Sequence, residues 1–190
     1  MTHSQPDRRV RRTRARLEQA MLELLREKDA RSITVRELTQ RADVNRGTFY
    51  AHYKDVFDLL DQMEQALFLR LTQLLSSYSI QDLQQGLTPL LTDIFCFVRD
   101  DPVLRLAFLD QRTQDSFFRR LDQLIYEKCR KDWQGLFLPA DQPLWGCCLD
   151  FLVSGAVGLA RGWMSRGFLE EPEQMAQLAN RLILTGLSLS

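Results

Sequence analysis

One stretch near the N-terminus constrains this chain more than any other, because residues 32–53 have the pattern of two short helices joined by a tight turn. Thr34 and Glu37 have the spacing of a capping box, in which each side chain accepts the backbone N–H of the other residue. We therefore expect the first helix to start at Thr34. Asn45, a strong N-cap residue, predicts the start of the second helix. Asp43 lies in the turn between them, where Asp tolerates the left-handed conformation better than most residues.

The two predicted helices each have an apolar face and a polar face. Val35, Leu38 and Ala42 fall at positions i, i+3 and i+7, and Phe49 and Tyr53 are four residues apart. We expect these five side chains to face the core. The polar face of the second helix combines hydrogen-bond donors with one glycine small enough for close backbone approach: Arg46, Gly47, Thr48, Tyr50 and His52. Such a set suits the major groove of DNA, so the pattern predicts a helix-turn-helix.

A resemblance to a known family rests on residues 33–38, on Ala42 and on residues 46–53. The sequence Ile-Thr-Val-Arg-Glu-Leu at 33–38 and Arg-Gly-Thr-Phe-Tyr-Ala-His-Tyr at 46–53 resembles the signature of TetR/AcrR transcriptional regulators, over roughly residues 10–65. The resemblance implies a three-helix DNA-binding domain, a helical ligand-binding and dimerisation domain behind it, and repression relieved by a small molecule. By position it implies DNA contacts at Thr34, Arg36, Arg46, Thr48, Tyr50 and His52.

The chain departs from the family pattern at two positions. Asp43 lies where members often have Gly, and Val56 lies where a Lys usually begins the next helix. Lys54, two residues earlier, can reach the same phosphate backbone, so we include it among the candidate DNA contacts.

The remainder of the chain also has helical spacing. Apolar residues from 56 to 75 predict one long helix, capped by Asp55, that links two domains. Further helices are expected over about 80–99, after Pro102, and over about 113–137, 144–166 and 172–187, with a loop at 138–143. The predicted fold is all-α: a basic arm and three-helix helix-turn-helix domain over residues 1–55, and a larger helical domain over 56–190.

Charge is unevenly distributed, although the formal net charge is zero. Residues 1–54 hold 13 Lys and Arg against 7 Asp and Glu, and the remainder holds 12 against 18. A basic N-terminal part suits an approach to phosphates. Its densest segment, between Arg8 and Arg16, is interpreted as a solvated helix start or as an arm that contacts phosphates or the minor groove, and the two interpretations are compatible.

Several classes of protein are not expected. No apolar run approaches the roughly 20 residues of a membrane span, and no secretory signal follows the arginine-rich start, so we expect a cytoplasmic protein with no membrane partner. The four cysteines lack metal-ligand spacing, so we expect buried thiols and no metal site. His3 and His52 are the only histidines, and no phosphate-binding glycine motif occurs. We therefore expect neither catalysis nor a cofactor.

The second domain is rich in aromatic residues and ends in small ones. Thirteen of 18 aromatic residues follow Ser77, which indicates either a filled core or an apolar pocket. The candidate ligand-binding residues are Phe95, Phe117, Trp133, Trp145 and Phe151. Gly155, Gly158 and Gly162 are costly in an exposed helix and therefore indicate close helix packing. The resemblance implies that the last two helices form a dimer interface, and internal packing in a monomer is the alternative.

Together these features predict a homodimeric, sequence-specific DNA-binding transcriptional regulator. It would be a repressor, released from a palindromic operator on double-stranded DNA by a small hydrophobic or aromatic effector. One alternative is a DNA-tethered protein-interaction module or co-activator without a small-molecule pocket. Another is a nucleoid-type binder with no specific operator.

Overall fold

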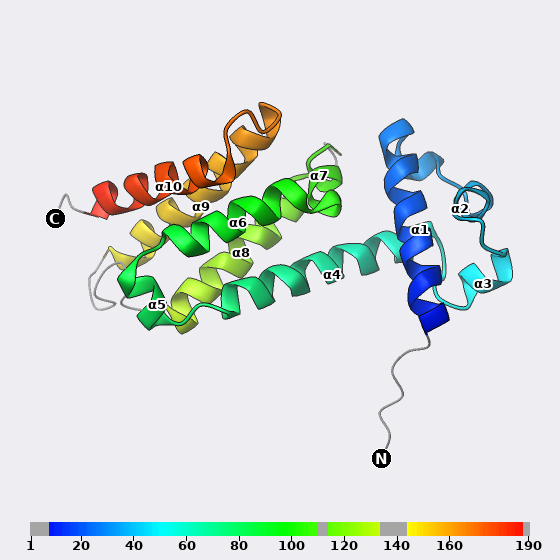
Figure 1. Ribbon diagram of the computed structural model, residues 1–190, viewed down its shortest axis with the longest axis horizontal. Coiled ribbons are helices and arrows are strands. Elements are labelled where there is room, and N and C mark those ends of the chain that lie inside the picture. The colour runs from blue at the N-terminus through cyan, green and yellow to red at the C-terminus, as the bar shows by residue number, and fades with distance from the viewer. Residues whose placement is uncertain (1–7, 110–113, 134–143, 188–190) are drawn as a thin grey trace, which may run out of the picture. The chain divides into compact units, whose positions relative to one another are not determined.

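The protein is built from helices that form two compact units. The computed structural model describes residues 8–109, 114–133 and 144–187, and every regular element in those ranges is helical. Contacts divide the chain into an N-terminal unit, Met1–Leu67, and a C-terminal unit, Phe68–Ser190. Figure 1 shows the order of the helices along the chain. The predicted all-α fold is confirmed.

The N-terminal unit is a small helical domain. Its elements are α1 (Arg8–Glu27), a 3-10 turn (Ala30–Ser32), α2 (Val35–Ala42), α3 (Arg46–Tyr50) and the first part of α4 (Val56–Ser76). α1 packs against α2, and α2 against α3. Leu17, Met21, Leu38, Phe49 and Leu59 are fully buried and form the centre of the core. The expected inward faces of the two motif helices are therefore confirmed at Leu38 and Phe49.

The basic segment between Arg8 and Arg16 is helical, as the alternative of a solvated helix start predicts. It forms the first turns of α1. The amphipathic pattern that buries Leu17 and Met21 extends back into this segment, and Arg has a high helix propensity. Most of its arginines are exposed, as a solvated helix start requires.

α4 crosses the boundary between the two units. Its start is capped as expected, because the N–H of Asp58 donates to Asp55 Oδ1 at 2.9 Å. Val56, Leu59, Met63 and Leu67 are all buried. The contacts therefore divide the chain after Leu67, inside the helix, whereas the sequence analysis placed the boundary where α4 begins.

Within its described residues, the C-terminal unit holds the rest of α4 and six further helices. These are α5 (Ile80–Gln85), α6 (Thr88–Asp100), α7 (Pro102–Leu109), α8 (Gln114–Asp132), α9 (Trp145–Ser165) and α10 (Pro172–Leu187). α10 packs along α6, and α8 packs along α9. The helix expected over 80–99 is two helices, because Gly86 at φ +157° breaks it and Pro89 lies in the first turn of α6. The loop expected at 138–143 lies outside the described residues.

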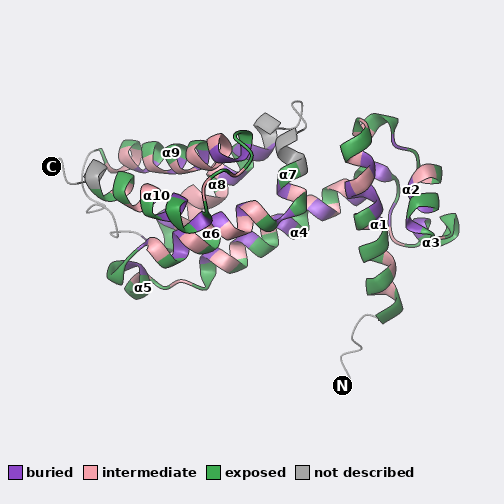
Figure 2. Ribbon diagram, turned by 45° about the horizontal axis from the view of Figure 1, so that its top comes forward, coloured by how far each residue is buried: buried purple, intermediate pink, exposed green. Residues whose placement is uncertain are grey.

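α9 is more exposed than a core helix. Figure 2 shows it largely in the exposed and intermediate colours. By length and composition alone this helix of 21 residues could cross a membrane, with a mean hydropathy of 1.2 over its most apolar window. That corrects the expectation that no run is long enough, since Asp150 and Arg161 do not break the window. Core helices of soluble proteins meet the same criterion, so this is weak evidence for a span. Only 28% of the window is buried, so most of its apolar surface has no cover among the residues that the structure describes.

The cysteines do not share one environment. Cys129 is buried, and burial raises the pKa of its thiol to about 12. Cys147, near the start of α9, is exposed, and Cys96 and Cys148 are half-buried. All four are free thiols, but the expectation that they are buried is correct only for Cys129. The apolar residues around each cysteine in the sequence predicted burial for all four. They do not reveal that Cys147 lies on the exposed side of α9.

Candidate DNA-binding surface and apolar cavity

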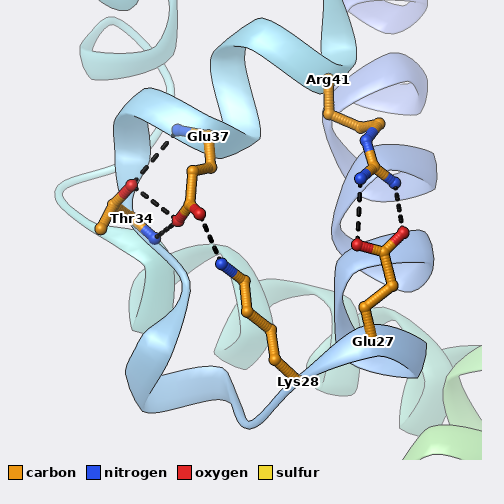
Figure 3. Close-up of polar contacts among 5 residues, drawn as sticks. All are labelled: Glu27, Lys28, Thr34, Glu37 and Arg41. Atoms are coloured by element: carbon orange, nitrogen blue, oxygen red, sulfur yellow. Dashed lines mark hydrogen bonds and ion pairs between the residues drawn. The ribbon is translucent and has the colours of Figure 1, made fainter.

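The start of α2 is fixed by the predicted capping box, which the structure confirms. The N–H of Glu37 donates to Thr34 Oγ1 at 3.2 Å, and the N–H of Thr34 donates to Glu37 Oε2 at 3.0 Å. Figure 3 shows that Lys28 joins this cap: its Nζ donates to Glu37 Oε1 at 2.5 Å. The hydrogen bond from Lys28, together with those from Thr34, lowers the pKa of Glu37 to about 2. The carboxylate therefore remains ionised at any physiological pH.

Arg41 holds α2 against α1 and is not part of the outer face. Its guanidinium donates two hydrogen bonds to the carboxylate of Glu27, at 2.8 and 3.0 Å (Figure 3). Glu23 lies 3.6 Å from the same guanidinium. The hydrogen bond from Arg41 lowers the pKa of Glu27. Arg36 and Gln40 are then the exposed polar residues of α2 that remain available to a partner.

The turn between α2 and α3 has the predicted left-handed residue. Asp43 has φ 51° and ψ 51°, and its N–H donates to the carbonyl oxygen of Gln40. Its carboxylate accepts a hydrogen bond from Arg16 Nη2 at 2.6 Å. Sequence reasoning missed this ion pair, because the partners are 27 residues apart and no local pattern connects them. The pair places a negative charge, balanced by Arg16, beside the candidate DNA-binding surface.

α3 presents its polar residues to solvent. Asn45 caps it as predicted, since Asn45 Oδ1 accepts the N–H of Gly47 at 2.7 Å. Phe49 and Tyr53 are buried, and Tyr50 is 59% exposed. The helix ends at Tyr50, so His52 lies just beyond it and is half-buried. The other candidate DNA contacts are all exposed: Thr34, Arg36, Arg46, Gly47, Thr48 and Lys54.

A surface groove of about 650 Å³ runs between α2 and α3. Its lining consists of Arg36, Thr39, Gln40, Asp43, Val44, Asn45 and Arg46. The groove brings Arg36 and Arg46 together, and it adds Gln40, which the sequence analysis did not select. The sequence feature that points to Gln40 as a candidate DNA contact is its position four residues after Arg36, which places both residues on the same helix face. The other candidate contacts lie outside this lining.

The C-terminal unit contains a partly open apolar cavity of about 120 Å³. It lies among α4, α6, α7, α8, α9 and α10, and its described lining is Leu71, Leu75, Leu87, Leu90, Leu91, Ile94, Phe95, Phe97, Val98, Leu104, Leu121, Ile125, Cys129, Trp133, Leu149, Leu152, Val153, Ala156, Val157, Ala160, Ala179 and Ile183. Two of the five candidate ligand-binding residues, Phe95 and Trp133, belong to it.

The other three candidate ligand-binding residues lie outside this lining. Phe117 is buried against Phe68, with ring centroids 5.3 Å apart. Trp145 is half-buried at the start of α9, and Phe151 is 75% exposed. Helical spacing shows that aromatic residues share a face, but it does not show which face meets another helix.

The small residues of α9 lack packing partners among the described residues. A Cβ placed on Gly155 or Gly158 would meet no described atom within 4 Å, and both residues are exposed, as is Ser154. Gly162 has a close neighbour, because a Cβ placed on it would lie 3.2 Å from Arg166 Nη1. Internal packing in a monomer therefore does not account for Gly155 and Gly158.

The described residues contain no cluster of three or more His, Cys, Asp or Glu side chains able to hold a metal ion. The polar groove of the N-terminal unit and the apolar cavity of the C-terminal unit are the candidate ligand surfaces.

Two known protein families match this chain, one in each unit. Residues 19–63 match the family described as bacterial regulatory proteins, tetR family, and residues 85–185 match the family described as transcriptional regulator C-terminal region. A curated relative is the uncharacterized HTH-type transcriptional regulator YxbF of Bacillus subtilis, 45% identical over 62 residues. That match covers 32% of this chain and 16% of YxbF, so it spans about a sixth of the relative's length.

Solved structures share the fold over most of the chain. The dihydroxyacetone kinase operon activator DhaS superposes with a TM-score of 0.67 at 17% identity, covering 93% of this chain and 97% of DhaS. SmeT, the repressor of the Stenotrophomonas maltophilia multidrug efflux pump SmeDEF, superposes with a TM-score of 0.63 at 19% identity, covering 91% of this chain and 89% of SmeT. At these identities the likeness concerns the fold.

Proposed function

The chain belongs to the tetR family of bacterial regulatory proteins, a family of DNA-binding transcriptional regulators that is not an enzyme family, and on this premise we propose that it is a cytoplasmic, homodimeric repressor with a specific operator and no catalytic activity. The observation that carries the proposal is the outer face of α2 and α3. A capped helix, a left-handed turn and a second capped helix hold Arg36, Gln40 and Arg46 around one open groove.

Each candidate contact has a role that its chemistry suits. Arg46, Thr48 and His52 meet base edges in the major groove, where Arg reads guanine with two hydrogen bonds. Gly47 lets the backbone approach closely. Thr34, Arg36, Tyr50 and Lys54 contact the phosphate backbone and fix the register of the helix in the groove.

The proposed dimer forms through α9 and α10, because these helices carry apolar and small residues that no other described part of the chain covers. Phe151 is 75% exposed and Leu182 is 57% exposed, and a neighbouring helix can approach closely over Gly155 and Gly158. A twofold pair of chains presents two recognition helices to successive major grooves, about 34–36 Å apart on a palindromic site.

The dimer is tested by matched charge insertions. Leu182→Glu is expected to shift the sedimenting species from dimer to monomer, because it buries an unpaired carboxylate at the interface. Leu69→Glu is the control, since Leu69 is similarly exposed at 60% but belongs to α4, which is not part of the proposed interface. Monomerisation by both variants, or by neither, would contradict the assignment.

Effector control requires that a ligand binds one state of the dimer better than the other, since equal affinity shifts nothing. The cavity suits this role because α4, which crosses into the N-terminal unit, contributes Leu71 and Leu75 to its lining. Arg70 on α4 donates a 2.5 Å hydrogen bond to Asp101, whose Oδ1 accepts the N–H of Val103 at the start of α7. A ligand that separates α4 from α7 therefore has to strain this ion pair.

The co-activator alternative retains one observation in its favour. Pockets for drug-sized ligands have volumes of about 300–1,000 Å³, whereas this cavity has about 120 Å³. A protein whose C-terminal unit binds another protein needs no such cavity. A thermal-shift screen separates the two readings, because a ligand that binds the folded state raises the melting temperature by mass action.

The experiment for the operator is selection of genomic fragments by the purified full-length chain at about 0.15 M salt, where specific and non-specific binding are well separated. We expect enrichment of one short palindrome. Uniform capture with a steep salt dependence would instead indicate a nucleoid-type binder and overturn the proposal of a specific operator.

A further inference from the structure

The chemistry of the cavity in the C-terminal unit indicates what kind of molecule it admits. Its described lining consists of aliphatic and aromatic side chains, whose only polar groups are the thiol of Cys129 and the indole N–H of Trp133. The described lining contains no charged side chain. A water molecule against such a lining finds few hydrogen-bond partners. The space is therefore suited to an apolar guest.

One buried polar atom at this cavity has no partner. Trp133 lines the cavity, is only 5% exposed, and its Nε1 atom forms no hydrogen bond. Burial of an N–H without an acceptor is unfavourable, and most buried donors in proteins are satisfied. Lys128 lies 5.7 Å from the centre of the same ring, but an ammonium group cannot accept the N–H. The site thus lacks one hydrogen-bond acceptor.

A second buried tryptophan, Trp163, has a hydrogen-bond acceptor for its indole N–H. Trp163 is fully buried, and its Nε1 donates to the carbonyl oxygen of Glu170 at 3.0 Å. Among the described residues, a backbone acceptor is therefore provided for the indole of Trp163 and none for the indole of Trp133. This difference is specific to the residue that lines the cavity.

The size and polarity of the cavity restrict the guest further. An engineered protein cavity of about 150 Å³ admits benzene, so a space of about 120 Å³ corresponds to a molecule with a single ring. Burial raises the pKa of the Cys129 thiol to about 12, because the surroundings disfavour charge. The same desolvation excludes carboxylate and ammonium ligands.

We propose that this cavity binds an uncharged, single-ring apolar molecule that accepts a hydrogen bond from the indole N–H of Trp133. The inference rests on the proposed function, since it names the effector class of the C-terminal unit. Phe95 and the aliphatic lining supply contact area, and Trp133 selects for an acceptor.

The test uses two probes of the same shape. Pyridine carries one acceptor and benzene carries none, and in mildly alkaline buffer both are uncharged. Each is titrated into the full-length protein, labelled with nitrogen-15 at tryptophan, and the indole N–H signals are followed by NMR. We expect both probes to bind and only pyridine to move the Trp133 signal strongly downfield. The Trp163 signal is the internal control and should move little, because its N–H already has an acceptor.

A variant isolates the hydrogen bond from the cost of desolvating pyridine. In Trp133→Phe the affinity for pyridine relative to benzene is expected to fall about three- to tenfold, the worth of one net hydrogen bond. Ala156→Leu, which fills the cavity, is expected to abolish binding of both probes. Benzoate should not bind to any of these proteins. No binding of either uncharged probe, equal movement of the Trp133 signal by both, or binding of benzoate would overturn the proposal.

The same titration, repeated on protein bound to its selected DNA, distinguishes this inference from the proposed function. If pyridine moves the Trp133 signal but leaves DNA affinity unchanged, the cavity assignment holds and effector control through it fails. If other molecules release the DNA while the Trp133 signal stays fixed, effector control holds and the cavity assignment fails.

Discussion

Replacing Asp43 tests the turn on which the recognition surface depends. A left-handed conformation costs an L-residue other than Gly, Asn or Asp roughly 1–2 kcal/mol, and Asp43 holds φ 51° and ψ 51°. Asp43→Gly and Asp43→Ala both remove the carboxylate and the ion pair with Arg16, so the difference between them isolates the backbone. We expect Asp43→Gly to be more stable than Asp43→Ala by about 1 kcal/mol, slightly less than the full strain because Gly loses more entropy on folding.

The assay is urea unfolding of both variants, with the slope of the transition compared as well as its midpoint. Asp43→Asn is a further control, because Asn also tolerates the left-handed region while lacking the charge. All three variants are expected to bind any DNA more tightly than the parent chain, since each removes a negative charge from the groove and frees Arg16 for phosphates. Equal stability of the Gly and Ala variants would refute the account of the turn.

Further predictions concern base reading, the cap of α2 and the thiols. Arg46→Ala should cost about 1–3 kcal/mol of operator affinity and relax preference at one base pair, whereas Tyr50→Phe should weaken binding about equally on all sequences; equal losses on operator and scrambled DNA would exclude Arg46 from base reading. The fold lowers the pKa of Glu37 from 4.5 to about 2, so the stabilisation by its carboxylate is present above pH 4.5 and is lost as pH falls toward 2. The difference in melting temperature between the parent chain and Glu37→Gln should therefore shrink over that pH range. A difference that stays constant with pH would contradict this. A thiol reagent should modify exposed Cys147 rapidly and buried Cys129 only after unfolding, measured by mass spectrometry, and early modification of Cys129 would contradict its burial.

The sequence predicted the parts of the fold that depend on local chemistry. The cap at Thr34, the left-handed Asp43 and the cap at Asn45 each involve residues within a few positions of one another. Spacing also predicted that Phe49 and Tyr53 face the core. Such features require no knowledge of what lies elsewhere in the chain.

Features that join distant residues were beyond sequence reasoning. The Arg16–Asp43 and Arg70–Asp101 pairs link residues 27 and 31 positions apart. The break at Gly86 was missed because apolar spacing continues on both sides of it.

The aromatic residues show the same limit. Trp133 and Phe151 both looked like ligand residues, yet only the first lies at the cavity. Which helix faces meet is decided by packing among α6, α8, α9 and α10, and the period of one helix does not reveal its neighbours.

The central claim is that a dimer of this chain reads one DNA sequence through α3. The most direct measurement is competition binding of the full-length chain to its selected palindrome and to scrambled DNA at about 0.15 M salt, with stoichiometry determined in the same experiment. The account predicts two chains per palindrome and a preference of at least about 10³-fold, which Arg46→Ala reduces. Equal affinity for both DNAs, or one chain per palindrome, would contradict it.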